Sequence, residues 1–250
     1  MDRAVSSGEP RLRGARRQQR SVRVTWDDGA AASFHHLWLR DNCPCRQCRH
    51  PETLERILDP LAVPLTWCLS FIARNRSVSE RLEREADEVL GDRPLSAADY
   101  DRLPYARAVF HEALRLAPPA FFMEREARAD CVLGGRHRIP KGTVLQLCMG
   151  LVHRQPAYFD GPREFRPERW RDGTPTDCPA HAYMPFSYEP RRCPAWEFCT
   201  MEGVFLLAAI AQRLRIEPAW SGSVKSDFMI IYDVKGSLPV TVRERERAVS

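Results

Sequence analysis

Residues 185–198 read PFSYEPRRCPAWEF, and the interpretation of the whole chain depends on this stretch. It places Cys193 after two arginines and before a proline, with the aromatic residue Phe186 seven positions upstream. A cysteine thiolate can ligate a metal ion, and neighbouring cations favour the thiolate form. The alternative is that Cys193 is one of nine ordinary cysteines, which usually pack as small apolar side chains. The rest of the sequence has to decide between these two interpretations.

Two earlier stretches carry charged residues in a regular pattern. HEALRL at 111–116 places Glu112 and Arg115 three residues apart, so that on a helix both lie on one face and can pair. Taken alone, such a pair is normally exposed and contributes little to stability. FRPERW at 165–170 adds Arg169 as a candidate third member. A buried network of these charges is tolerable only when it is complete, because a lost partner leaves the others unpaired.

In this order the stretches resemble the C-terminal half of a cytochrome P450, over about residues 65–250. The loop resembles the family pattern FxxGxRxCxG, with Glu189 and Ala195 where glycines are expected. HEALRL resembles the ExxR signature, and FRPERW the meander that contributes a further arginine. RHRIPKGTVLQ, VHRQPAYF and the closing VKGSLPVTV resemble the family's strand turn, the segment before the meander and the terminal hairpin.

The resemblance implies a haem b cofactor with Cys193 as the axial ligand of its iron. An anionic sulfur donates electron density to haem iron and favours cleavage of dioxygen. By the same resemblance, Phe186 shields the sulfur, Arg191 and Arg125 contact the haem propionates, and Glu112, Arg115 and Arg169 form a structural triad. The implied fold class is mainly α with a small β region.

The implied activity is that of a haem-thiolate monooxygenase, which inserts one oxygen atom from O₂ into a small organic substrate. Electrons would come from a separate redox partner, a ferredoxin or a reductase. LTWCLSFIARN at 65–75 resembles the end of the long helix above the haem, but DPLAVP at 59–64 stands where the family has an acidic or amide residue and threonine. We therefore expect a truncated fold, with little turnover by this chain alone.

Local patterns predict several elements. Apolar residues at three- and four-residue steps favour helices over 77–91 and 196–214. A further helix is expected from Pro104 to Leu116, stopped by Pro118-Pro119. Residues 22–26 alternate like a strand, a turn follows, and 31–39 could be a second strand or a short helix. Residues 229–234 and 238–242 flank Lys235-Gly236-Ser237, which predicts a hairpin.

A cysteine cluster lies in LWLRDNCPCRQCRHPET at 37–53. Cys43, Cys45 and Cys48 could ligate one Zn²⁺, which takes four sulfur or nitrogen ligands in a tetrahedron. VTWDDG and FHHLWLRDNCPC make residues 22–59 resemble the small N-terminal zinc domain of gamma-butyrobetaine dioxygenases. In that family the fourth ligand is a histidine further along the chain, and His50 is a local alternative here. We predict a β-rich, zinc-domain-like module over 21–60.

Most of the net charge of +5 comes from residues 1–20, which contain six arginines and few apolar residues. We expect this segment to be a disordered basic arm and not a nucleic-acid-binding element. No apolar run approaches the length needed to span a bilayer, so we expect a cytoplasmic protein. Two other functions stay open: a zinc-binding interaction module, and a fusion fragment without function.

Overall fold

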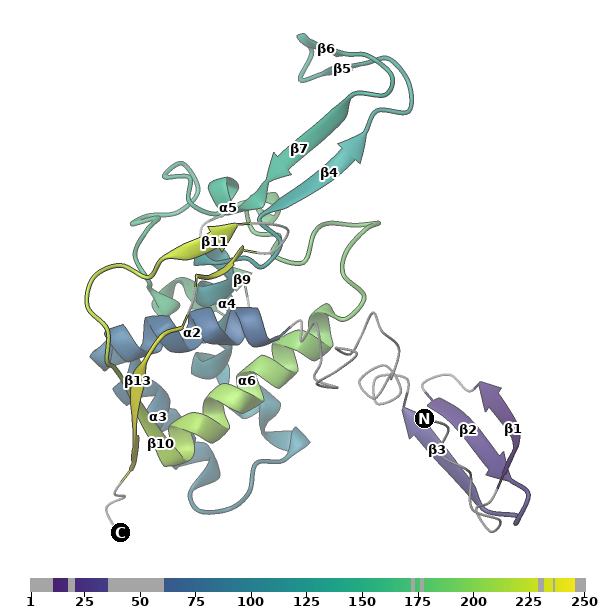
Figure 1. Ribbon diagram of the computed structural model, residues 1–250. Coiled ribbons are helices and arrows are strands. Elements are labelled where there is room, and N and C mark those ends of the chain that lie inside the picture. Colours follow the sequence, from purple (N-terminus) through teal and green to yellow (C-terminus); the bar gives the residue numbers. More distant parts are fainter. Residues whose placement is uncertain are drawn as a thin grey trace. The chain divides into compact units, whose positions relative to one another are not determined.

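The computed structural model describes residues 11–17, 21–35, 61–171, 174–175, 178–228, 232–235 and 237–245. The chain divides into two compact units, Met1–Asp59 and Pro60–Ser250, which are described separately (Figure 1). The boundary falls inside DPLAVP at 59–64. Its prolines were expected to disfavour regular structure, but Ala62–Pro64 form the first turn of a helix, where a proline removes no intrahelical hydrogen bond. Within the described ranges, no helix is both long and apolar enough to cross a membrane.

The first unit contains an antiparallel sheet in the order β1-β2-β3. Its strands are β1 (Leu12–Arg17), β2 (Ser21–Trp26) and β3 (Ala31–His35). Val22 and Val24 alternate with exposed Arg23, as expected for a strand with one covered face. A disordered arm was predicted over 1–20, but 12–17 form a strand, because pairing with β2 satisfies backbone groups in a way that local composition does not reveal. Between the two alternatives for residues 31–39, the described part, 31–35, is a strand.

The second unit is built around a helical core. Its helices are α2 (Ala62–Arg74), α3 (Arg76–Leu90), α4 (Pro104–Leu116), α5 (Met149–Val152) and α6 (Trp196–Arg213). Short 3-10 turns are η1 (Ala97–Arg102), η2 (Pro167–Arg169) and η3 (Ala180–Ala182). Figure 1 shows α2, α3, α4 and α6 gathered together, and their apolar side chains form one buried cluster. The helices predicted over 77–91, 104–116 and 196–214 are thus confirmed.

Helix α4 is the centre of this core. All but two of its residues are buried, whereas α3 buries only a stripe that includes Val78, Leu82 and Ala86. At the N-terminus of α4, the Glu85 carboxylate accepts the backbone N–H groups of Tyr105 and Ala106 at 2.6 and 2.8 Å. Those N–H groups have no partner within the helix, so a side chain of α3 caps α4.

Helices α4 and α6 pack unusually close together. A Cβ atom added at Gly203 of α6 would lie 2.3 Å from the Phe110 ring of α4, far inside contact distance. Phe110 itself is fully buried. Glycine is needed here because of the close approach of the two helices, not because of its backbone angles.

The strands of the second unit form antiparallel pairs. β4 (Phe122–Glu126) pairs with β7 (Val144–Cys148), and β5 (Cys131–Leu133) with β6 (His137–Ile139), forming the arm that extends from the helices in Figure 1. The short strands β8 (Trp170–Arg171) and β9 (Thr174–Pro175) also pair. The hairpin predicted at the C-terminus is wrong, because β12 (Tyr232–Val234) pairs with β11 (Ser226–Phe228), and β13 (Val240–Glu244) with β10 (Leu214–Pro218).

Candidate functional site

Cys193 lies in a tight loop directly before helix α6. Its backbone N–H donates to the Phe186 carbonyl at 2.8 Å, and its own carbonyl accepts the Trp196 N–H at 3.3 Å. Within the loop, the Arg191 N–H donates to the Tyr188 carbonyl at 3.0 Å. The Cys193 thiol is free and partly buried. These bonds close the loop on itself and place the sulfur-bearing residue beside the N-terminus of a long helix.

The side chains of the loop divide between core and solvent. Phe186 packs against the helical core, whereas Arg191 is exposed. The Arg192 guanidinium lies 3.6 Å from the centre of the Trp196 ring, a cation–π contact. Among the described residues, Arg191 has no ion-pair partner.

Strand β4 reaches the loop through Arg125. Its Nη2 donates to the Ser187 hydroxyl at 3.3 Å, and that hydroxyl donates to the Met123 sulfur at 3.7 Å. Ser187 has a φ of 69°, in the left-handed region that favours glycine. This conformation occurs at Ser187 and not at Glu189, which stands where the family pattern has glycine.

Glu112 and Arg115 form a completely buried ion pair. Arg115 Nε and Nη2 each donate to a Glu112 carboxylate oxygen at 2.8 Å. The remaining Arg115 hydrogens donate to the carbonyls of His153, Pro162 and Glu164 at 2.8 to 3.0 Å. All five N–H donors of the guanidinium are therefore satisfied, which is what burial of a cation requires.

The carboxylate of Glu112 accepts three further hydrogen bonds. Arg169 Nε donates at 3.0 Å, the Arg166 backbone N–H at 2.9 Å and the Trp170 indole N–H at 2.9 Å. The structure thus brings together Glu112, Arg115 and Arg169, the three residues suggested by sequence. It adds Trp170, whose only sequence signal was its place next to Arg169 in FRPERW.

His153 connects this network to the Cys193 loop. Its carbonyl accepts from Arg115, and its Nε2 accepts the Met184 backbone N–H at 3.0 Å. The Met184 carbonyl in turn accepts the Ser187 N–H at 3.1 Å. Burial lowers the pKa of His153 to about 3, so the ring is neutral and able to accept. Sequence reasoning noted VHRQPAYF but did not single out this histidine.

A second buried histidine lies beside the network. The His111 Nδ1 and the Tyr183 hydroxyl are 2.9 Å apart, and the hydroxyl also donates to the His111 carbonyl at 3.2 Å. Burial lowers the pKa of His111 to about 4. The His111 ring stacks on Trp170, with 5.3 Å between ring centres. Neutral aromatic groups therefore surround the charged network.

The groups at the loop fit the thiolate side of a haem. A free, partly buried thiol could ligate iron, and Phe186, whose carbonyl accepts the Cys193 N–H, has an aromatic ring that could limit access of water to the sulfur. Arg191 and Arg125 are exposed cations that could meet carboxylates. The residues present are therefore of the kinds that ligation of haem by sulfur requires.

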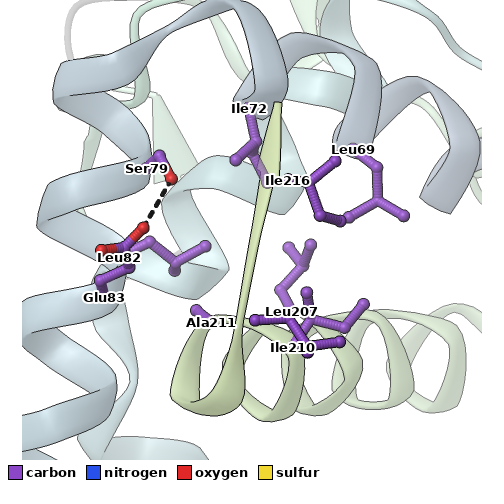
Figure 2. Close-up of a pocket in the computed structure, with 10 residues that line it drawn as sticks. Leu69, Ile72, Ser79, Leu82, Glu83, Leu207, Ile210, Ala211 and Ile216 are labelled. Atoms are coloured by element: carbon purple, nitrogen blue, oxygen red, sulfur yellow. Dashed lines mark hydrogen bonds between the residues drawn. The ribbon is translucent and has the colours of Figure 1, made fainter. Parts of the chain in front are cut away.

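A cavity elsewhere in the unit is unsuited to an organic substrate. It has a volume of about 20 Å³ and lies between α2, α3, α6 and β10. Most of the side chains that line it are apolar, and the Ser79–Glu83 hydrogen bond lies at one side of it (Figure 2). This volume is close to that occupied by one water molecule. None of the residues that line it belongs to the Cys193 loop. The cavity is therefore a packing gap of the helical core.

The predicted zinc ligands Cys43, Cys45 and Cys48, together with His50, lie outside the described residues. Within the described ranges, no group of three or more histidine, cysteine or acidic residues is arranged to hold a metal ion. The zinc site therefore stays a prediction.

Comparison with known proteins gives two matches along the chain. The profile of the family described as Cytochrome P450 matches residues 58–229. The profile of the family described as Gamma-butyrobetaine hydroxylase-like, N-terminal, matches residues 14–71. The two matches overlap at helix α2, so the second extends past the boundary between the two units.

Individual relatives agree with the first match. Cyclooctatin synthase of Streptomyces melanosporofaciens is 38% identical over 161 residues, which are 64% of this chain and 35% of that protein. Human cytochrome P450 4V2 is 35% identical over 161 residues, 64% of this chain and 30% of that protein. The crystal structure of a cytochrome P450DA mutant haem domain superposes with a TM-score of 0.70 and 26% identity, covering 78% of this chain and 48% of that one.

This chain spans about a third of the length of the curated relatives it matches. The profile match nevertheless covers more than half of the chain and includes the Cys193 loop and the Glu112 network. We conclude that this chain belongs to the cytochrome P450 family.

Proposed function

We propose that the chain binds haem b with Cys193 as the axial ligand of the iron. The observation that carries this proposal is the Cys193 loop, closed by the hydrogen bond from Cys193 to Phe186 and followed directly by α6, in a region that matches the family. When bound, haem would supply the activation of O₂ for oxidation of an organic substrate. The residues of this chain would hold and orient it.

Each loop residue would have a separate task. Phe186 would keep water from the sulfur, and Arg191 would pair with a propionate. Arg125 would approach the haem from the strand side, where it already contacts Ser187. The buried charges of Glu112, Arg115 and Arg169 would have no contact with substrate and would keep the framework rigid.

We further propose a monooxygenase activity with a small organic substrate and electrons from a separate ferredoxin or reductase. The matched region aligns with 48% of the P450DA haem domain, so we expect this chain by itself to show little turnover. A cytoplasmic location stays a prediction.

The test is an absorption spectrum of the full chain, reconstituted with haem, reduced and exposed to carbon monoxide. We expect the red-shifted Soret band of thiolate ligation, lost in Cys193→Ala. Cys199→Ala is the matched control, since Cys199 is a partly buried cysteine of α6 and should leave the band unchanged. A band that survives in Cys193→Ala would refute the assignment of Cys193.

A zinc-binding module at the front of the chain is the second candidate. The gamma-butyrobetaine hydroxylase-like match covers Cys43, Cys45 and Cys48, whose thiolates suit zinc. Elemental analysis of purified protein should give about one zinc per chain. A variant with all three cysteines changed to serine should contain none, whereas Cys131→Ser, at an exposed cysteine of β5, should retain it. Equal zinc in all three proteins would refute the site.

A further inference from the structure

Ser187 has a strained backbone and a side chain that both donates and accepts a hydrogen bond. Its φ of 69° is costly for a residue with a Cβ atom, and such a conformation persists only where the surroundings enforce it. Its hydroxyl donates to the Met123 sulfur at 3.7 Å and accepts from Arg125 Nη2 at 3.3 Å. Both contacts are made by residues of strand β4. Met123 and Arg125 are two residues apart, and they therefore lie on the same face of the strand.

Ser187 is next to the residue whose carbonyl holds Cys193 in the loop. The preceding residue, Phe186, carries the carbonyl that accepts the Cys193 N–H at 2.8 Å. The N–H of Ser187 itself donates to the Met184 carbonyl at 3.1 Å, so the chain reverses direction here. A restraint on Ser187 is therefore a restraint on the carbonyl that holds Cys193.

We propose that Ser187 is a positioning residue that fastens the Cys193 loop to strand β4, through Met123 and Arg125, and thereby orients the thiolate for haem. This inference rests on the haem function proposed above. Under this proposal, Arg125 has two roles: it acts on the thiolate through Ser187, and it approaches a haem propionate as expected above. The hydroxyl of Ser187 links the strand side of the site to the sulfur side.

The first test needs no haem. Hydrogen exchange of the peptide containing the Cys193 amide is compared in the wild type, Ser187→Ala, Arg125→Ala and the double variant. Each single change should accelerate exchange about two- to tenfold, the range expected for loss of one hydrogen bond. The double variant should be no faster than the faster single variant, because both changes break the same link.

The second test uses the haem-loaded chain. Ser187→Ala should lower the ratio of carbon monoxide complex that shows the thiolate band to complex that does not, by a few fold, because the thiolate has lost part of its support. Ser187→Asn should restore much of it, because asparagine tolerates a left-handed backbone and can bond to Arg125. Arg128→Ala is the control, as Arg128 is an exposed arginine just beyond β4.

The outcomes separate the two proposals. A wild type without any thiolate band would refute the haem function, while the exchange experiment would still decide whether Ser187 restrains the loop. Unchanged exchange in Ser187→Ala would overturn the positioning role. Additive effects in the double variant would overturn the link between Ser187 and Arg125.

Discussion

The Glu112 network and the Cys193 loop differ in how their charges are satisfied. Around Glu112 and Arg115, every donor of the buried guanidinium finds an acceptor within the chain. At the loop, Arg191 is exposed and the Cys193 thiol is only partly buried. A network that satisfies itself is tolerated in the core but is costly to break, whereas cations left facing solvent are available to a ligand. The two regions should therefore respond differently to mutation.

The largest effect should come from breaking the network. Glu112→Ala would leave Arg115 buried without its counter-charge, and loss of one partner of a buried pair costs about 3–5 kcal/mol. Urea denaturation, followed by circular dichroism, would measure the change in the free energy of unfolding. Glu124→Ala, at an exposed position of β4, is the control and should cost less than about 0.5 kcal/mol. A loss for Glu112→Ala as small as that of the control would contradict a structural role for the network.

A smaller effect should appear on acidification. Because burial lowers the pKa of His153 to about 3, the unfolded chain, with an ordinary pKa of 6.5, binds the proton first as the pH falls. The stabilisation is therefore complete above pH 6.5 and is lost progressively toward pH 3, and His153 should contribute about 1–2 kcal/mol of the loss between pH 7 and pH 5.

The pH effect can be checked by measuring the free energy of unfolding across that range. His153→Gln should reduce the pH dependence, since a glutamine oxygen can accept the Met184 N–H and does not titrate, and the slope that is left should come in part from His111. His137→Gln, at an exposed histidine of β6, should leave the slope as in the wild type. If the slope is the same in all three proteins, His153 does not titrate as its burial implies.

The smallest effect on stability is expected at the loop. Arg191→Ala removes an exposed side chain and should change the free energy of unfolding by less than about 0.5 kcal/mol. If Arg191 pairs with a propionate, the same change should accelerate haem loss several-fold, measured by transfer of haem to an excess of apomyoglobin. Arg163→Ala, a second exposed arginine, should affect neither quantity. A large loss of stability in Arg191→Ala would show that the two regions are not distinct.

Sequence reasoning succeeded where the signal is local. The helices over 77–91 and 196–214 follow from their apolar periodicity. Helix α4 follows from Pro104, which suits the first helical position, and from the prolines that end it. Sequence reasoning failed where two strands that are far apart in the sequence pair with each other. β13 pairs with β10 across the whole C-terminal segment, and no local pattern distinguishes this from a hairpin with β12.

In the candidate site, too, the sequence identifies residues that belong to a local motif and misses residues that depend on tertiary contacts. Glu112, Arg115, Arg169 and Cys193 could be named because they match motifs of a known family. Trp170, His153 and Ser187 could not, because their roles depend on tertiary contacts. Ser187 is the clearest case, since serine carries no sequence signal for a left-handed backbone and its two side-chain partners lie more than sixty residues earlier in the chain.

The close approach at Gly203 has a consequence for protein engineering. Replacing a helical glycine by alanine is a common way to raise thermal stability. In α6 the added methyl group would collide with the Phe110 ring and push the two helices apart. The N-terminus of α6, which directly follows the Cys193 loop, lies seven residues before Gly203, about 10 Å along the helix axis. Gly203→Ala should therefore lower the melting temperature instead of raising it, and a shift of α6 would also displace the proposed haem ligand, Cys193.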